Sequence, residues 1–109
     1  MNEYGLSPIA GVVGAVKVKN ALKKIDPDLV LDIKNVRING QLQGCSGFVT
    51  DPATGNVVYL NTDCNHGTSL GEAYYRTAEH TKDYTGGRNR FTSYRELPQD
   101  VVNLLREGR

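Results

Sequence analysis

Two turn signals, separated by one short segment of chain, constrain this sequence more than any other feature. Asn39-Gly40 is the dipeptide most typical of a two-residue β-hairpin turn, because both residues tolerate positive φ angles. Asp51-Pro52-Ala53-Thr54-Gly55 predicts a second turn, of type I, closed by a glycine in the left-handed conformation. The segments that these turns join are residues 29–38, 44–50 and 56–61. The sequence therefore predicts three consecutive antiparallel strands.

The second hairpin also has a predicted register. Its facing pairs are Thr50 with Asn56, Phe48 with Val58, and Gly47 with Tyr59. The last pair would place an aromatic ring over a glycine of the neighbouring strand. In the first strand the period of two changes phase near Lys34-Asn35, which predicts a β-bulge there. Both faces of the second hairpin carry apolar residues, so we expect each face to be at least partly covered.

A helix is expected before the strands, over residues 8–25. Ser7 is a favourable N-cap, and Pro8 suits the first helical turn. Apolar residues recur at roughly helical spacing up to Ile25. Glycines and valines lower the helix propensity of the segment, so a strand over residues 9–18 is the alternative. Asp26-Pro27-Asp28 ends the helix, because a residue that precedes proline is pushed out of the helical region.

A second helix is predicted over residues 70–82. Ser69-Leu70-Gly71-Glu72 has the pattern of a capping box, and residues 70, 73, 74, 77, 78 and 81 would face the sheet. Gly86-Gly87 ends this region, and a short strand follows at Arg90–Arg95. Pro98 opens a last helix that carries Val101, Val102, Leu104 and Leu105. The prediction is an α+β fold, a three-stranded antiparallel meander with flanking helices, in the order αβββα then βα.

Length and composition indicate one domain over residues 1–109. Apolar residues form 39% and charged residues 23% of the chain, which excludes disordered and membrane-spanning classes. The net charge of +1 gives no overall attraction to nucleic acid or anionic membranes. The longest apolar stretch, Ile9 to Val16, is interrupted by glycines and has neither the length of a membrane span nor the basic start of a signal peptide. We expect a soluble cytoplasmic protein with two free thiols.

Four side chains are candidates for metal binding or thiol chemistry: Cys45, Cys64, His66 and His80. Cys64-x-His66 would place two ligands on one face of an extended segment. The other spacings lack the close pairs of structural zinc sites, so we expect no metal and no cofactor. Cys64 with His66 is also the one local pair suited to nucleophilic catalysis. No established catalytic motif accompanies this pair, and we expect no enzymatic activity.

The segment Lys82–Arg95 is the main candidate for a binding site. It joins four positive charges and one negative charge to three aromatic residues, with two glycines between them. The candidate binding residues are Tyr84, Arg88, Arg90, Phe91 and Arg95. Arginines pair with phosphates, aromatic rings stack on unpaired bases, and a Gly-Gly turn can hold an anion. The alternative is a solvated connection whose aromatic residues anchor it to the core. A second basic stretch, Lys17, Lys19, Lys23 and Lys24, is expected to be a solvated helix face.

Residues 44–63 (GCSGFVTDPATGNVVYLNTD) and 74–91 (YYRTAEHTKDYTGGRNRF) resemble small uncharacterised proteins of actinobacterial phages and their hosts. The resemblance implies an accessory protein of a bacterial or phage-infected cytoplasm that occupies a surface of a host macromolecule. The order αβββα is also similar to that of the double-stranded-RNA-binding domain. That family has a lysine cluster at the start of its second helix, whereas this chain has residues Thr68–Glu72 there.

We therefore expect a non-enzymatic binding protein whose partner is a protein or a nucleoprotein assembly. One alternative is a nucleic-acid-binding module that uses residues 82–95. A second alternative is a small ribonuclease that uses Arg, Tyr and His side chains.

Overall fold

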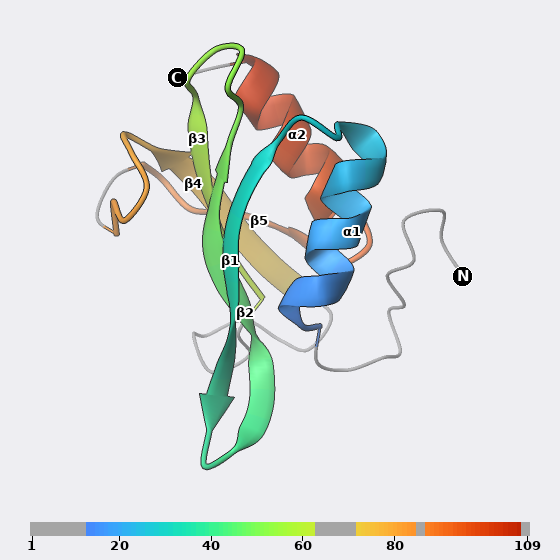
Figure 1. Cartoon of the computed structure of the whole chain (residues 1–109). Helices are drawn as coiled ribbons and strands as arrows, with labels where there is room; N and C mark the ends of the chain where they lie inside the picture. Colours follow the sequence, from blue (N-terminus) through green and yellow to red (C-terminus); the bar gives the residue numbers. More distant parts are fainter. Residues whose placement is uncertain (1–12, 63–71, 85–86, 108–109) are drawn as a thin grey trace.

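The computed structural model describes residues 13–62, 72–84 and 87–107, which form a sheet of five strands and two helices. The elements are α1 (Ala15–Ile25), β1 (Val30–Ile38), β2 (Gln41–Thr50), β3 (Val57–Asn61), β4 (Glu72–Ala78), β5 (Arg90–Ser93) and α2 (Leu97–Glu107). The strands are antiparallel in the order β1-β2-β3-β4-β5, so each strand lies beside its neighbour in sequence (Figure 1). The α+β class is confirmed. The sheet is a meander of five strands, where three were expected.

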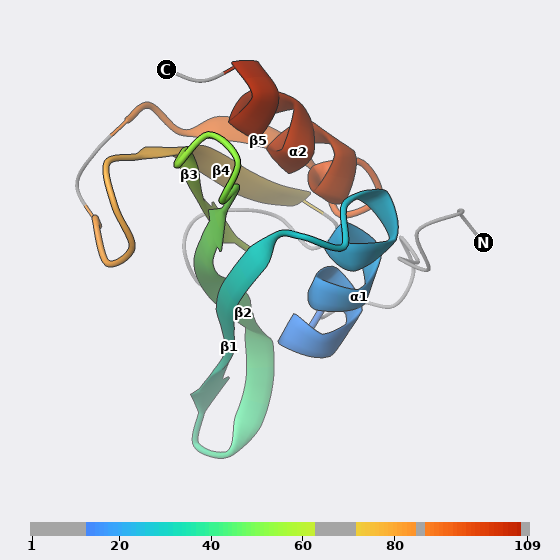
Figure 2. The same ribbon diagram turned by 45° about the horizontal axis from the view of Figure 1, so that its top comes forward.

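Both helices cover the same face of the sheet, as Figures 1 and 2 show. The main core lies between this face and the helices. It is formed by Val18 and Leu22 of α1, several residues of the last helix, and inward-facing strand residues such as Ile33, Val49 and Leu60. We call the opposite sheet surface, which neither helix covers, the open face. The open face carries a second, smaller cluster of buried residues, formed by Phe48, Val57, Tyr59 and Ala78.

The start of α1 depends on a contact from the sheet. Gly14 is the N-cap and has no side chain to satisfy the first helical amides. The Asn35 side chain of β1 accepts a hydrogen bond of 2.8 Å from the Ala15 amide instead. The helix ends at Ile25, before Asp26-Pro27, as expected. The alternative of a strand over residues 9–18 is wrong for residues 15–18, and residues 8–12 of the expected helix lie outside the described residues.

Both predicted turns are confirmed. Asn39 and Gly40 have φ angles of 52° and 79°, and Gly55 has a φ angle of 78°. The predicted bulge at Lys34-Asn35 lies two residues further along, where the register shifts between Val36 and Arg37. At that point Gln43 of β2 is the additional residue, because Val36 pairs with Gly44 and Arg37 pairs with Leu42.

The register predicted for the second hairpin is wrong by one residue. The observed pairs are Thr50 with Val57, Phe48 with Tyr59, and Gly47 with Leu60. The shift arises because the Asp51 amide donates a hydrogen bond of 2.9 Å to the Asn56 carbonyl, so the hairpin closes with a four-residue loop. Tyr59 therefore faces Phe48 and not Gly47. This glycine instead allows a close approach of β1, since a Cβ atom there would lie 2.1 Å from the Asp32 carbonyl oxygen.

The predicted helix over residues 70–82 is wrong, because Glu72–Ala78 forms strand β4 between β3 and β5. Residues 69–71 lie outside the described residues. In the strand, Ala73 and Tyr75 face the helices, whereas Tyr74 and Arg76 face the open side. Tyrosine and threonine favour strands, and pairing on both edges outweighs the short capping pattern.

The final two elements agree with expectation. The predicted strand at Arg90–Arg95 is β5, and Pro98 lies in the first turn of α2. All the apolar residues expected on α2 are buried: Val101, Val102, Leu104 and Leu105. Among the described residues, neither helix is long and apolar enough to cross a membrane.

Thr62, directly after β3, forms a hydrogen-bonded junction inside the molecule. Its hydroxyl group donates a hydrogen bond of 2.9 Å to the Val13 carbonyl and accepts one of 2.9 Å from the Cys45 amide. Its carbonyl accepts a hydrogen bond of 3.2 Å from the Tyr94 hydroxyl group. Thr62 and Tyr94 are almost fully buried. The junction therefore joins the segment before α1, strand β2 and the segment before α2.

Thr62→Val should lower the free energy of unfolding by about 1–3 kcal/mol, because the isosteric change leaves a buried carbonyl and a buried amide without partners. Thr62→Ser keeps the hydroxyl group and should lose about 1 kcal/mol, the value of one methyl group. Chemical denaturation monitored by circular dichroism measures both. Equal losses for the two variants would contradict the role of the hydroxyl group.

Gly55→Val should cost more than about 1 kcal/mol of stability, because a β-branched residue adopts a positive φ angle poorly. No atom lies within 4 Å of a Cβ at this position, so the loss would come from backbone conformation alone. Gly55→Asn is the matched control and should lose less, since asparagine tolerates the left-handed region. The denaturant midpoints of the wild type, Gly55→Val and Gly55→Asn measure these losses.

Candidate binding surface

The open face carries a continuous row of aromatic rings across four adjacent strands and one connection. We define the aromatic row as Tyr84, Phe48, Tyr59, Tyr74 and Phe91. Centroid distances between successive rings are 5.3 Å from Tyr84 to Phe48, 5.2 Å from Phe48 to Tyr59, 6.2 Å from Tyr59 to Tyr74, and 6.1 Å from Tyr74 to Phe91. These distances lie within the range of favourable aromatic pairs. The row thus joins β2, β3, β4 and β5 with the connection between β4 and β5.

The middle and the ends of the aromatic row differ in exposure. Phe48 and Tyr59 are buried, whereas Tyr84 is 67% exposed and Phe91 is 62% exposed. Single exposed apolar residues are normal on a protein surface, whereas exposed rings that belong to one continuous apolar surface indicate an interaction site. Both exposed residues belong to the binding segment predicted from the sequence. The structure brings them to the same face and to opposite ends of one row.

Arg76 holds the β4–β5 connection against the open face. Its guanidinium carbon lies 4.6 Å from the centroid of the Tyr59 ring, and the side chain is buried. The group donates a hydrogen bond of 2.8 Å to the Asp83 carbonyl and one of 3.3 Å to the Thr77 carbonyl. The Asp83 carboxylate in turn accepts a hydrogen bond of 2.9 Å from the Glu79 amide. These contacts place residue 84, the next in sequence, against Phe48.

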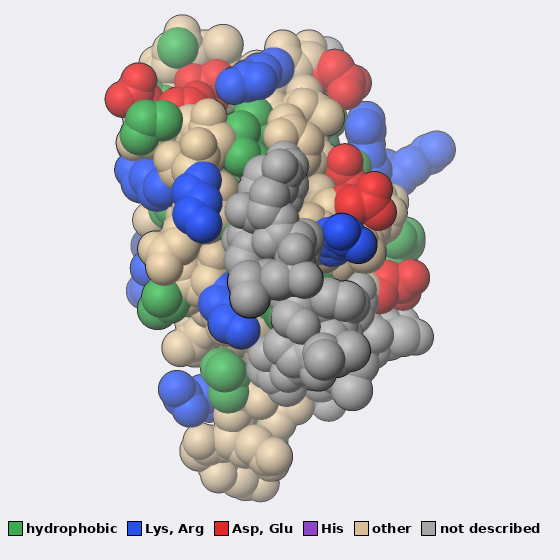
Figure 3. Space-filling view, turned by 90° about the vertical axis from the view of Figure 1, so that its right-hand side faces the viewer, with side chains coloured by type: hydrophobic (Ala, Val, Ile, Leu, Met, Phe, Trp, Pro, Cys, Tyr) green, Lys and Arg blue, Asp and Glu red, His purple; other side chains and the backbone are tan. Residues whose placement is uncertain are grey.

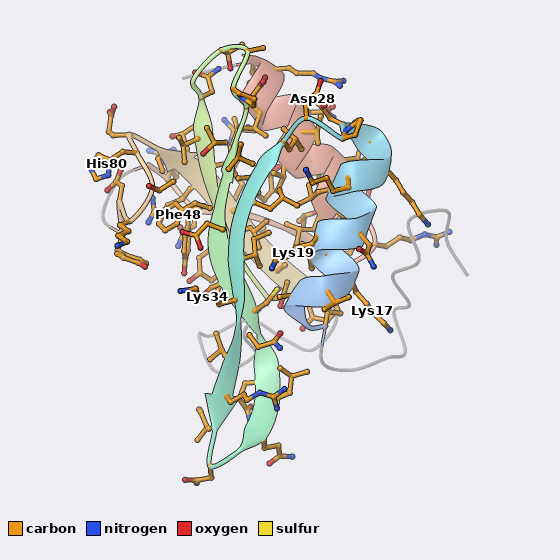
Figure 4. All side chains as sticks on the ribbon, viewed as in Figure 1. Lys17, Lys19, Asp28, Lys34, Phe48 and His80 are labelled. Carbon is orange, nitrogen blue, oxygen red and sulfur yellow. The ribbon has the colours of Figure 1, made fainter. Side chains whose placement is uncertain are left out.

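Positive and negative side chains surround the Tyr84 end of the aromatic row. A shallow hollow of about 130 Å³ beside Phe48 is lined by Asp32, Lys34, Ser46, Gly47, Lys82 and Tyr84. Figure 4 shows Phe48 and Lys34 on the side of the sheet away from the helices, with His80 on the same side. This end of the row therefore combines an exposed ring with two lysines and one carboxylate.

The predicted arginines do not join this surface as a group. Arg90 pairs with Tyr75 across the ladder, and its side chain hydrogen-bonds the Tyr75 hydroxyl group on the helical side. Burial, followed by the charge of Asp100, raises the pKa of Tyr75 against the opposing effect of Arg90. Arg95 is exposed between β5 and α2, and Arg88 is exposed in the β4–β5 connection. Of the candidate binding residues, Tyr84 and Phe91 therefore lie on the open face and Arg90 lies on the helical side.

The candidates for thiol and metal chemistry have ordinary structural environments where the structure describes them. Cys45 is buried, and burial raises the pKa of its thiol to about 11, so the group is protonated at neutral pH and unsuited to nucleophilic attack. His80 lies in the β4–β5 connection and not on a helix, with Nδ1 at 2.7 Å from the Thr81 carbonyl oxygen. Cys64 and His66 lie outside the described residues. Within the described part of the chain, no three His, Cys, Asp or Glu side chains form a group suited to a metal ion.

The basic stretch on α1 has a partly structural role. Lys17, Lys23 and Lys24 are exposed and Lys19 is half-buried. The Lys23 ammonium group donates hydrogen bonds of 2.9 Å and 2.8 Å to the Pro27 and Leu29 carbonyls, which fastens the end of the helix to the start of β1. Figure 3 views the helical side, where several Lys and Arg side chains lie along one border and others lie on the opposite side among acidic side chains.

Sequence reasoning missed the central residues of the surface, which are Phe48, Tyr59, Tyr74 and Arg76. A partial signal was present, because both faces of the second hairpin are apolar. Tyr74 and Arg76 were missed because residues 70–82 were expected to form a helix, with Tyr74 on its core side and Arg76 on its solvent side. Reading residues 72–78 with a period of two would have placed both residues on one face.

Arg76→Met should release the β4–β5 connection, because methionine fills similar space without donating to the Asp83 carbonyl. The Glu79 amide should then exchange with solvent at least about tenfold faster, a change equivalent to about 1.4 kcal/mol of local opening. Hydrogen exchange measured by NMR checks this. Lys23→Met, which removes a cation on the helical side, is the control and should leave the Glu79 amide unchanged.

The open face offers ring surfaces and charged groups at its ends. The hollow beside Phe48 is smaller than the roughly 300 Å³ at which small-molecule sites begin. Such a face can contact an extended surface of another macromolecule. The chain matches no protein-family model, no curated protein and no solved structure.

Proposed function

We propose that this protein is a non-enzymatic binding protein and that its open face contacts a protein partner. The observation that carries the proposal is the aromatic row, whose two terminal rings are exposed while Phe48 and Tyr59 between them are buried. A partner that covers Tyr84 and Phe91 would remove both rings from water without any rearrangement of the sheet. Burial of exposed apolar surface is the main source of binding free energy at protein interfaces.

The distribution of charge favours a protein over a nucleic acid. A nucleic-acid site would need several cations beside the exposed rings, because phosphate contacts supply most of the affinity. Arg90 is turned to the helical side, and Arg76 is buried under its own contacts. Asp32 lies beside Lys34 and Lys82 at the Tyr84 end of the row. Mixed charges at the edge of an aromatic surface are typical of a protein interface.

Single-stranded nucleic acid is the second candidate partner. The observation that favours it is the position of Tyr84, exposed on a sheet face beside two lysines. Aromatic rings on open sheets stack with unpaired bases, and nearby lysines contact the phosphates. The accessory role in a phage or bacterial cytoplasm is compatible with either partner and stays a prediction.

The double variant Tyr84→Ser, Phe91→Ser should fold normally and lose its partner. Both side chains are mostly exposed, so the structural loss should be small, whereas binding should fall at least about tenfold if they are central to the interface. Val16→Ser is the matched control, because Val16 is 67% exposed but lies on α1. The measurement is affinity capture from cells of the native source with nuclease treatment, read by mass spectrometry, followed by titration of the purified captured protein. Equal capture by both variants would contradict the proposal.

The wild type and the double variant also test whether the partner is single-stranded nucleic acid. A labelled oligothymidylate of about twelve nucleotides, titrated by fluorescence anisotropy, should show no binding if the partner is a protein. Binding that weakens with salt would favour nucleic acid. In that case Lys34→Ala with Lys82→Ala should reduce the slope of log affinity against log salt by roughly 1.4, or about 0.7 for each lost phosphate contact.

A further inference from the structure

Strand β1 has an open edge. It pairs only with β2, because it is the first strand of the sheet. Figure 1 views the molecule toward this edge, with β1 in front of the other strands and both helices to one side, and the β1–β2 hairpin extends beyond the helices. Among the described residues, no hydrogen bond joins the free side of the β1 backbone to another segment. A nine-residue edge with unpaired amides and carbonyls can accept another strand.

The side chains of β1 have a self-complementary pattern. Val30, Asp32, Lys34 and Val36 lie on the open face in alternation, and Asp32 and Lys34 are both exposed. If a second copy of β1 pairs antiparallel about a two-fold axis at Ile33, residue 32 of each copy faces residue 34 of the other, and residue 30 faces residue 36. Each carboxylate then lies opposite an ammonium group, and each valine lies opposite a valine.

Other registers of the same pairing are less favourable. An axis at Lys34 places the two Lys34 side chains opposite each other, and an axis at Asp32 places the two Asp32 side chains opposite each other. A parallel pairing in register also places like charges side by side, which destabilises neighbouring strands. Charges on an edge strand usually prevent association. Of these pairings, only the one centred on Ile33 places Asp32 and Lys34 each opposite a charge of the other sign.

We propose that two copies of this protein associate through β1, antiparallel about Ile33, to form one continuous sheet. Such a contact is isologous, so it closes at a dimer and leaves no further β1 edge exposed. The net charge of +1 gives little repulsion between the copies. Both open faces lie on the same side of the joined sheet. The proposal does not depend on the function proposed above, because it uses the edge of the sheet and not the aromatic row.

Charge reversal on β1 tests the register directly. Asp32→Lys and Lys34→Asp should each weaken self-association at least about tenfold, because each puts like charges at both facing positions. An equimolar mixture of the two variants should form a heterodimer about as tightly as the wild type forms its homodimer, since every facing pair is then opposite in charge. The double variant Asp32→Lys, Lys34→Asp should likewise restore the homodimer. Sedimentation velocity from micromolar to millimolar protein measures the association of the wild type, the two single variants, their mixture and the double variant.

The control is Arg95→Asp, a charge reversal beyond β5, which should leave self-association unchanged. Circular dichroism and the recovery of association in the mixture show that the single variants are folded. A wild type that is monomeric at millimolar concentration would overturn the proposal. Single variants that associate as strongly as the wild type, or a mixture that associates no better than its components, would overturn it as well.

Discussion

The buried hydroxyl group of Thr62 is the interaction on which the rest of the arrangement depends. It supplies a donor to the segment before α1 and an acceptor to β2, while its own carbonyl receives the Tyr94 hydroxyl group. Backbone groups that are buried without partners are strongly destabilising, so each of these segments is held where its hydrogen bond is satisfied. Thr62 thus ties the segments that precede both helices to the sheet, and the main core packs both helices on the same face.

The local elements of this fold could be predicted, because their causes lie in a few neighbouring residues. Asn39-Gly40 and Gly55 specify their turns through backbone conformation alone. The register after Asp51 could not be obtained in this way, since it depends on whether the hairpin closes at position 50 or 51. Residues 72–78 fit a helical period and a strand period about equally well, and only the presence of strands on both sides selects the strand.

The ends of the candidate surface were predictable and its centre was not. Tyr84 and Phe91 were identified because exposed aromatic residues beside basic ones are typical of binding segments. Phe48 and Tyr59 come from strands distant in the sequence, so their meeting with Tyr84 depends on the sheet. Arg76 shows the difference most clearly. An arginine in a charged segment is normally solvent-exposed or binds a ligand. Arg76 is instead buried and contacts the Tyr59 ring and the Asp83 carbonyl of its own chain.

The sequential order of the strands has a consequence for how the molecule assembles. Each hairpin pairs adjacent segments, so the sheet can grow as the chain leaves the ribosome. The helical layer cannot form step by step in this way, because α1 and α2 pack together although they lie at opposite ends of the described chain. Until α2 emerges, the apolar side of the sheet and of α1 remains exposed to the cell. During synthesis the sheet therefore lacks part of its helical layer, and its exposed apolar side is prone to aggregation. This apolar side is covered when α2 packs against it.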